Sequence, residues 1–248
     1  MKKEIDNLYE KFINIKQRDW IKTIREGNNG VGLTFEYLLG IGQNELEIPD
    51  YNGIEIKTKR VSSHSHIILF SCTPTGPNYH EVEIIKNTYG YPHKLLPMYN
   101  ILNNSVYANR KNKIGSNFYF KLEIDKTEKK IYLIVYDKNK IKIEKSTYWD
   151  FDILEEKLNR KMKILALIKA YSKKENNVEL FKYSDFNIYT LRGFDNFIEL
   201  IEKGIIRLSF KLNIRTKGSK IGQIHDHGTS FEILEKDILK LYNKYELK

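Results

Sequence analysis

One short segment constrains this chain more than any other, because its apolar and charged side chains alternate. Within residues 49–60 (PDYNGIEIKTKR), Ile54 and Ile56 are apolar, whereas Glu55 and Lys57 are charged. Alternation with a period of two is typical of a strand that buries one face. We therefore expect a turn followed by a strand, with the two charged side chains on the same face of that strand.

Two carboxylates and one ammonium group are predicted to converge at this strand. Asp50 lies in the turn and can fold back onto the face that carries Glu55 and Lys57. Paired carboxylates suit Mg²⁺, which polarises a phosphate and lowers the pKa of a bound water that Lys57 can orient. The pattern favours hydrolysis of a phosphate ester by metal-activated water. The alternative is a solvated ion pair, because a D-x4-E-x-K string also arises by chance in charged proteins.

A predicted helix upstream adds another carboxylate. Residues 32–41 carry apolar side chains at helical spacing, glycines at 30 and 32 mark the start of the helix, and Glu36 lies in its first turns. Glu36 could hold a water or the outer shell of a metal. It could equally complement the helix dipole alone.

The composition favours a polyanionic partner. The chain has 42 Lys and Arg against 32 Asp and Glu, a formal net charge of +10, and neutralised phosphates release counterions. The alternative is a lysine-rich surface from an AT-rich genome, since Lys, Asn, Ile and Tyr are all abundant. Cys72 is the single cysteine, and we find neither an export signal nor an apolar run of the roughly 20 residues that span a membrane. We therefore expect a reduced, cytoplasmic protein.

A second constellation lies near the C-terminus, where residues 222–229 (GQIHDHGT) place His225 and His227 around Asp226. Imidazoles can donate to guanine acceptors, and Asp can accept from cytosine N4, so the segment fits base reading in a DNA groove. The alternatives are a metal site and a structural polar loop. Four basic residues precede the segment and fit the same interface: Lys211, Arg215, Lys217 and Lys220.

A further basic cluster covers residues 109–113 (NRKNK), with tyrosines on both sides, and its candidate contacts are Asn109, Arg110 and Lys111. It could clamp DNA phosphates. The alternative is a solvated charged face.

The remaining pattern mixes helices and strands without strict alternation, which predicts an α/β to α+β fold in one compact unit of two lobes. We expect helices over residues 3–25, 149–161 and 193–202, and a loop-rich interval around 74–93. A buried strand over 67–70 is expected beside the strand of Glu55. The other expected strands are 117–124, 131–136, 140–147, 163–170 and 205–214, followed by a polar loop over 218–228 and a final strand and helix.

The chain resembles a known family at several separate points. GVGLTFEYLLG followed by PDYNGIEIKTKR is similar to the opening of MutH-like PD-(D/E)xK endonucleases. GQIHDHGTSFEI resembles the matching segment of the monomeric restriction enzymes MvaI and BcnI. The strand ending at Leu69 and Phe70, the residues 109–111 and the residues 148–152 fit the same family in the same order, so the resemblance covers nearly the whole chain.

This resemblance implies a PD-(D/E)xK core in two lobes around a DNA cleft. We expect a catalytic lobe over about residues 1–150 and a DNA-recognition lobe over 151–248. Asp50, Glu55 and Lys57 would be catalytic, with Glu36 in support, and Asp50 and Glu55 would hold Mg²⁺. Mn²⁺ is expected to substitute, and Ca²⁺ to support binding without cleavage. The residues 225–227 would lie on the base-reading loop.

The implied function is that of a type II restriction endonuclease that acts as a monomer on a short double-stranded DNA site. We expect it in the cytoplasm of a bacterium, with a cognate DNA methyltransferase in the same system but not as a bound subunit. The alternatives are a MutH-type repair nickase and a non-catalytic, sequence-specific DNA-binding protein.

Two departures from the family concern specificity. Relatives carry arginines where this chain has Glu232 and Lys211. Arginine pairs with guanine, whereas glutamate accepts from cytosine, so Glu232 puts a CCNGG-type recognition site in doubt.

Overall fold

The computed structural model describes residues 1–42 and 48–247, and the side chains of all of these except residues 224–227. The fold is α+β, as predicted, and divides into two compact units. Unit 1 contains Met1–Ser65, Asn159–Arg192 and Ile238–Lys248, and unit 2 contains His66–Leu158 and Gly193–Asp237. The chain therefore does not divide at one boundary near residue 150, because strands from both halves of the sequence pair within unit 1.

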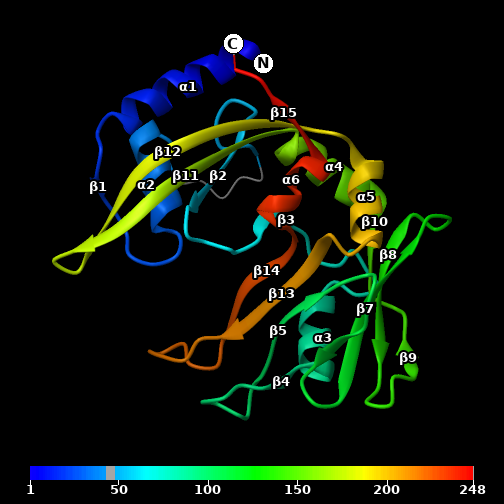
Figure 1. The fold of residues 1–248 in the computed structure, drawn as a ribbon. Helices are drawn as coiled ribbons and strands as arrows, with labels where there is room; N and C mark the ends of the chain where they lie inside the picture. Colours follow the sequence, from blue (N-terminus) through cyan, green and yellow to red (C-terminus); the bar gives the residue numbers. More distant parts are fainter. Residues whose placement is uncertain (43–47, 248) are drawn as a thin grey trace. The chain divides into compact units, whose positions relative to one another are not determined.

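Unit 1 contains a five-stranded sheet, and the helices α1 (Lys2–Lys16) and α2 (Gly30–Leu39) pack against it (Figure 1). The strands β11 (Ile164–Glu175) and β12 (Val178–Leu191) form a long hairpin. β11 also pairs in parallel with β2 (Glu55–Arg60), which is an edge strand of the sheet, so that Leu165 lies opposite Glu55. Ile54 and Ile56 of this segment join a core formed with apolar side chains of both helices. The elements are α1 (Lys2–Lys16), β1 (Ile21–Lys22), α2 (Gly30–Leu39), β2 (Glu55–Arg60), β11 (Ile164–Glu175), β12 (Val178–Leu191), α6 (Ile238–Leu241) and β15 (Tyr242–Tyr245).

Unit 2 contains two five-stranded sheets. The first has the order β3-β14-β13-β5-β4, and the second has the order β10-β8-β7-β6 with β9 beside β8. Their strands are β3 (Ile67–Ser71), β4 (Tyr91–Pro92), β5 (Asn100–Val106), β6 (Asn112–Ile114), β7 (Phe118–Asp125), β8 (Lys130–Tyr136), β9 (Lys142–Glu144), β10 (Tyr148–Asp150), β13 (Ile206–Ile214) and β14 (Ile224–Ile233). The helices α3 (Glu81–Tyr89) and α5 (Phe194–Glu202) and the short η1 (Glu235–Asp237) complete it, and α4 (Phe151–Met162) continues into unit 1.

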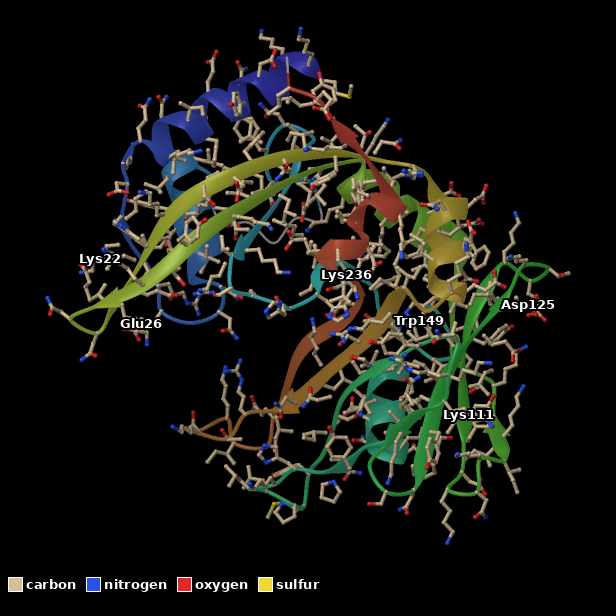
Figure 2. All side chains as sticks on the ribbon, in the orientation of Figure 1. Lys22, Glu26, Lys111, Asp125, Trp149 and Lys236 are labelled. Atoms are coloured by element: carbon tan, nitrogen blue, oxygen red, sulfur yellow. The ribbon has the colours of Figure 1, made fainter. Side chains whose placement is uncertain are left out.

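Aromatic side chains join the two sheets of unit 2. Trp149 is fully buried and labelled in Figure 2, and its ring lies 6.5 Å from that of Phe210 and 6.4 Å from that of Phe231. Its indole N–H donates to the carbonyl of Cys72 at 3.0 Å, which satisfies the one polar group of this large side chain. Among the described helices, none is long and apolar enough to cross a membrane.

Several predicted elements differ from the structure. The first helix ends at Lys16 rather than 25, because Asp19 adopts a left-handed conformation (φ 57°) and Ile21 pairs with β12. The strand over 67–70 does not belong to the sheet of β2 but pairs with β14 in unit 2. The polar loop predicted over 218–228 is wrong from Ile224 onward, where β14 begins. The prediction also missed α3, β5 and the long β12, and the chain ends in a strand after a short helix.

Candidate active site

The segment around β2 has the predicted geometry. Asp50 folds back so that its Oδ2 accepts a hydrogen bond from the N–H of Ile56 at 2.9 Å. Glu55 and Lys57 lie on one face of the strand, with Nζ of Lys57 2.5 Å from Oε1 of Glu55. The structure thus brings the three side chains together, and their catalytic role stays a prediction.

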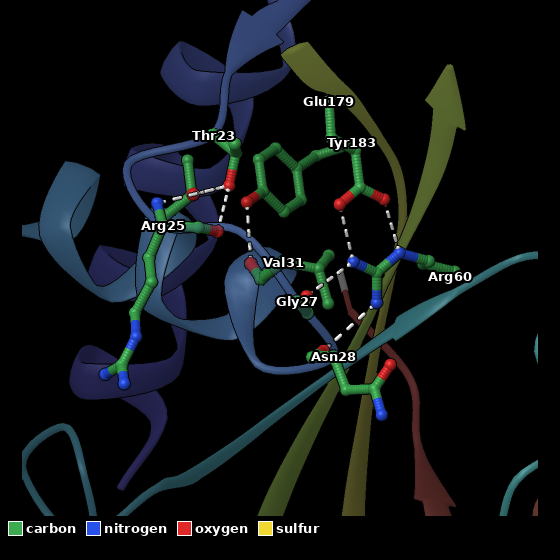
Figure 3. A network of polar contacts seen from close by, with 9 residues as sticks. Thr23, Arg25, Gly27, Asn28, Val31, Arg60, Glu179 and Tyr183 are labelled. Carbon is green, nitrogen blue, oxygen red and sulfur yellow. Dashed lines mark hydrogen bonds and ion pairs between the residues drawn. The ribbon is translucent and has the colours of Figure 1, made fainter. Parts of the chain in front are cut away.

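A network of polar contacts joins β2, which carries Glu55 and Lys57, to the loop before α2, which carries Glu36 (Figure 3). Arg60, the last residue of β2, donates from Nε and Nη2 to the two carboxylate oxygens of Glu179 on β12, at 2.8 and 2.9 Å. The same guanidinium donates to the carbonyls of Gly27 and Asn28, each at 3.0 Å. The loop that leads into α2 is therefore fixed against the strand that carries Glu55.

Glycine lets α2 approach β2 closely enough to place Glu36 at the site. A Cβ at Gly32 would lie 3.1 Å from Oγ1 of Thr58 and 3.7 Å from Oε1 of Glu36. A Cβ at Gly30 would collide with the carbonyl oxygen of Arg25. Gly30 is therefore required for packing, and Gly32 leaves room for a close approach to Thr58, in addition to marking the start of the helix.

The carboxylates of the site repel one another in a desolvated environment. Burial raises the pKa of Glu55, the charge of Lys57 opposes this, and the charge of Asp50 adds to it. Burial also raises the pKa of Glu36, with the charge of Asp50 as the next cause. Each of these carboxylates would be stabilised by additional positive charge.

Two residues of the site were not predicted from the sequence. Lys161, at the end of α4, places Nζ 3.6 Å from Oε1 of Glu55. Tyr242 of β15 is fully buried, and both burial and the charge of Glu55 raise the pKa of its hydroxyl. Both residues come from segments far from β2 in the sequence, and no local spacing marks them.

The donor atoms fit a hard divalent cation. Glu55 is 1% exposed, and its Oε2 is buried without a hydrogen-bond partner among the described residues. An unpaired buried carboxylate oxygen is costly unless a cation or water meets it. No group of three or more His, Cys, Asp or Glu side chains in the described part of the chain encloses a metal position. Mg²⁺ does not need such a cage, because it usually retains waters and binds one or two carboxylates.

The C-terminal constellation lies on a β-hairpin of unit 2. The backbone of residues 225–227 belongs to β14, where His225 and Asp226 pair with β13, and the side chains of these three residues lie outside the described part of the chain. β14 has a bulge at residues 227 and 228, which both lie opposite Lys211 of β13. Gly228 adopts a positive φ of +83° within this bulge. The turn between the strands carries three exposed basic residues: Arg215, Lys217 and Lys220.

The two other predicted DNA-binding residues of this hairpin contact each other. Nζ of Lys211 lies 2.5 Å from Oε1 of Glu232, whose side chain is 3% exposed. Burial by itself would raise the pKa of Glu232, but the hydrogen bonds and positive charges of Lys211 and Arg207 together lower it. Glu232 is therefore ionised at neutral pH and paired with both cations.

The cluster at 109–111 lies away from the turn of the hairpin. Nδ2 of Asn109 donates to the carbonyl of Lys203, which precedes β13. The guanidinium of Arg110 lies 3.7 Å from the ring centre of Tyr107. Nζ of Lys111, which is labelled in Figure 2, donates to the carbonyl of Lys140. Lys203 lies just before β13 and Arg215 lies just after it. The strand between them spans roughly 25 Å at about 3.3 Å per residue. The structure thus places these basic residues in two groups.

Comparison with known proteins agrees with this architecture. The family model for the MvaI/BcnI restriction endonuclease family matches residues 9–242. The structure described as the restriction endonuclease MvaI-cognate DNA substrate complex is 35% identical in sequence, with a TM-score of 0.92, and the match covers 99% of this chain and 98% of that one.

The structure of MvaI in the absence of DNA is 34% identical, with a TM-score of 0.62 and the same coverage of both chains. No curated protein matches the chain. Because the family model matches nearly the whole chain, and a solved member covers almost all of it above 30% identity, the chain belongs to the MvaI/BcnI restriction endonuclease family.

Proposed function

We propose that this restriction endonuclease binds a short specific site in double-stranded DNA and hydrolyses both strands with Mg²⁺. The observation that carries the proposal is the unpartnered, buried Oε2 of Glu55, on the strand face that Lys57 shares and close to Asp50. A cation at this position would meet the free oxygen and relieve the repulsion between the carboxylates. Asp50 and Glu55 are the residues that would hold it.

When bound, Mg²⁺ supplies polarisation of the phosphate and a lower pKa for water. The side chains of the chain position the reactants. Lys57 already donates to Glu55, which fixes its ammonium group beside the metal site, and its other N–H groups can hold the attacking water. Lys161 adds a second positive charge 3.6 Å from Oε1 of Glu55, where it can counter charge that develops on the phosphate. Glu36 can accept a hydrogen bond from an outer water.

We propose that unit 1 carries out hydrolysis and that unit 2 contributes most of the contacts to DNA. Unit 1 carries the carboxylates and lysines of the active site. Unit 2 carries the hairpin with residues 225–227, Lys211, Arg215, Lys217 and Lys220, which we assign to DNA contact. Asn109, Arg110 and Lys111 are assigned to phosphate contact elsewhere on unit 2. We expect the enzyme to act as a monomer, with Mn²⁺ able to replace Mg²⁺ and a methyltransferase protecting the host DNA without binding the enzyme.

Digestion of unmethylated genomic DNA tests this function. Purified protein is incubated with the DNA in Mg²⁺, with a parallel sample in Ca²⁺, and the ends are sequenced. We expect discrete ends that share one short motif in Mg²⁺, and bound but intact DNA in Ca²⁺. Products nicked in one strand only would instead support a MutH-type repair nickase. Intact DNA in both samples would support a non-catalytic DNA-binding protein.

A further inference from the structure

A buried carboxylate on the hairpin of unit 2 is held by two cations. Oε2 of Glu232 accepts from Nε and Nη2 of Arg207, at 3.0 and 2.7 Å. Oε1 accepts from Oγ of Ser230 at 3.0 Å and pairs with Nζ of Lys211 at 2.5 Å. Glu232 is only 3% exposed, whereas Arg207 and Lys211 are 21% and 30% exposed. The carboxylate is enclosed, and the two cations reach the surface.

The strand register explains why these three charges meet. Arg207 lies directly opposite Glu232 across the β13–β14 pair. Lys211 lies farther along β13 than Arg207 by an even number of residues, so both side chains lie on the same face of the strand. The other face of this strand packs into the core, where three side chains are at most 1% exposed: Leu208, Phe210 and Leu212. The network therefore belongs to the polar face of the sheet.

This face continues into the segment assigned to base reading. At the bulge, Lys211 lies between the pairs that Phe210 forms with Thr229 and Leu212 with Asp226, so its backbone runs beside His227 and Gly228. Lys211 thus links the ion pair of Glu232 to the hairpin residues 225–227.

The contacts of Glu232 determine whether its carboxylate can accept a further hydrogen bond from DNA. A carboxylate offers about four acceptor positions, and those of Glu232 already meet Arg207 twice, Ser230 and Lys211. No acceptor position remains for the amino group of a cytosine. Nη1 of Arg207 and two N–H groups of Lys211, by contrast, have no acceptor among the described residues.

We propose that Glu232 is a positioning residue that holds Arg207 and Lys211 as a pair of donors for guanine in the major groove. The inference rests on the proposed function and deepens it. Guanine presents two acceptors, N7 and O6, to that groove, and guanidinium and ammonium groups are their usual partners. The recognition site therefore contains guanine where these two side chains reach.

Selection from a duplex pool with a randomised core tests this assignment. Binding is carried out in Ca²⁺, and the bound DNA of the wild type, Arg207→Met, Lys211→Met and Glu232→Gln is sequenced. Glu202→Gln and Lys126→Met are matched controls, because this pair lies in the same unit at 3.0 Å but is 50% and 66% exposed. We expect the wild type and both controls to enrich one motif that contains guanine.

Each cation variant should lose the guanine preference at one position, by roughly 5- to 150-fold. Glu232→Gln should weaken the preference at both positions while binding to non-specific DNA stays equal or rises, since a negative charge is removed. A purely structural ion pair would lower thermal stability and affinity for all sequences equally, without changing the motif. Arg207→Lys, which keeps the charge but loses the planar guanidinium, should relax the motif at the arginine position in a folded protein.

The outcomes separate this inference from the function on which it rests. If the wild type cleaves and enriches a motif that all three variants share at equal strength, the assignment of Arg207, Lys211 and Glu232 is overturned while the endonuclease stands. If the wild type enriches no motif, both are overturned.

Discussion

Lys57 and Glu55 form an ion pair of 2.5 Å through Oε1, while Oε2 of the same carboxylate is buried and has no partner among the described residues. One oxygen of Glu55 is thus fixed by the strand itself and the other remains open to a ligand. This asymmetry explains how the site can orient a carboxylate before a cation binds.

Lys57→Met should reduce the rate of single-turnover cleavage by about 10²- to 10⁴-fold, because the group that positions water and counters charge is removed. Lys161→Met should have a smaller effect, since Lys161 is farther from Oε1 of Glu55, at 3.6 Å. Lys22→Met, an exposed change on β1, is the control and should leave the rate unchanged. A larger loss for Lys161 than for Lys57 would reverse the assigned roles.

Glu55→Gln should abolish cleavage and raise the melting temperature of the metal-free protein, because it removes a buried charge whose pKa is raised by burial. Mg²⁺ should raise the melting temperature of the wild type by binding only the folded state, and this increase should vanish in the variant. Thermal unfolding with and without Mg²⁺ measures both effects. Equal stabilisation of wild type and variant by Mg²⁺ would place the metal elsewhere.

Glu232 should make stability depend on pH in acid. Burial opposes ionisation of Glu232, but the hydrogen bonds and charges of Lys211 and Arg207 together lower its pKa in the folded protein. Its contribution is therefore present above the unfolded pKa of about 4.3 and lost as the pH falls through the lower folded value. Urea unfolding should show the wild type more stable than Glu232→Gln at pH 7, with a difference that shrinks below about pH 5. A difference that widens in acid would contradict this pairing.

Tyr242→Phe should raise the melting temperature of the protein. The hydroxyl of Tyr242 is buried without a hydrogen-bond partner in the described part of the chain, and such a group costs about 1–3 kcal/mol. Replacement by Phe removes the hydroxyl and retains the ring contact with Tyr189, whose centre is 6.3 Å away. A lower melting temperature would mean that the hydroxyl is satisfied, for example by a water that also meets Glu55.

The geometry of the segment that carries Asp50, Glu55 and Lys57 could be predicted because its signal is local. The alternation of apolar and charged side chains placed Glu55 and Lys57 on one face of the strand, and Asp50 lies in the turn directly before it. Lys161, Tyr242 and Arg207 were missed, because each reaches its partner only through tertiary pairing of distant segments. A lysine on a helix and a tyrosine on a strand carry no spacing that identifies these partners.

The errors in the fold have the same origin. The segment before Gly228 is polar and reads as a loop, but pairing with β13 makes it a strand with a bulge. The apolar run at Ile67 predicts a strand, yet sequence neighbours cannot tell that it pairs with β14 rather than β2. Local patterns therefore predicted many of the elements, whereas the pairings that build the two units were set by contacts between distant residues.

Asp50 and Glu55 are proposed to act together in metal-dependent cleavage, and the variant Asp50→Asn is the sharpest test of this pairing. The variant keeps the shape of the side chain and can still accept from the N–H of Ile56, a bond of 2.9 Å in the wild type. Cleavage in Mg²⁺ and binding in Ca²⁺ are measured on one DNA fragment that the wild type cuts. We predict that cleavage is lost while the fragment is still bound. Cleavage at the wild-type rate would contradict the assignment of this site.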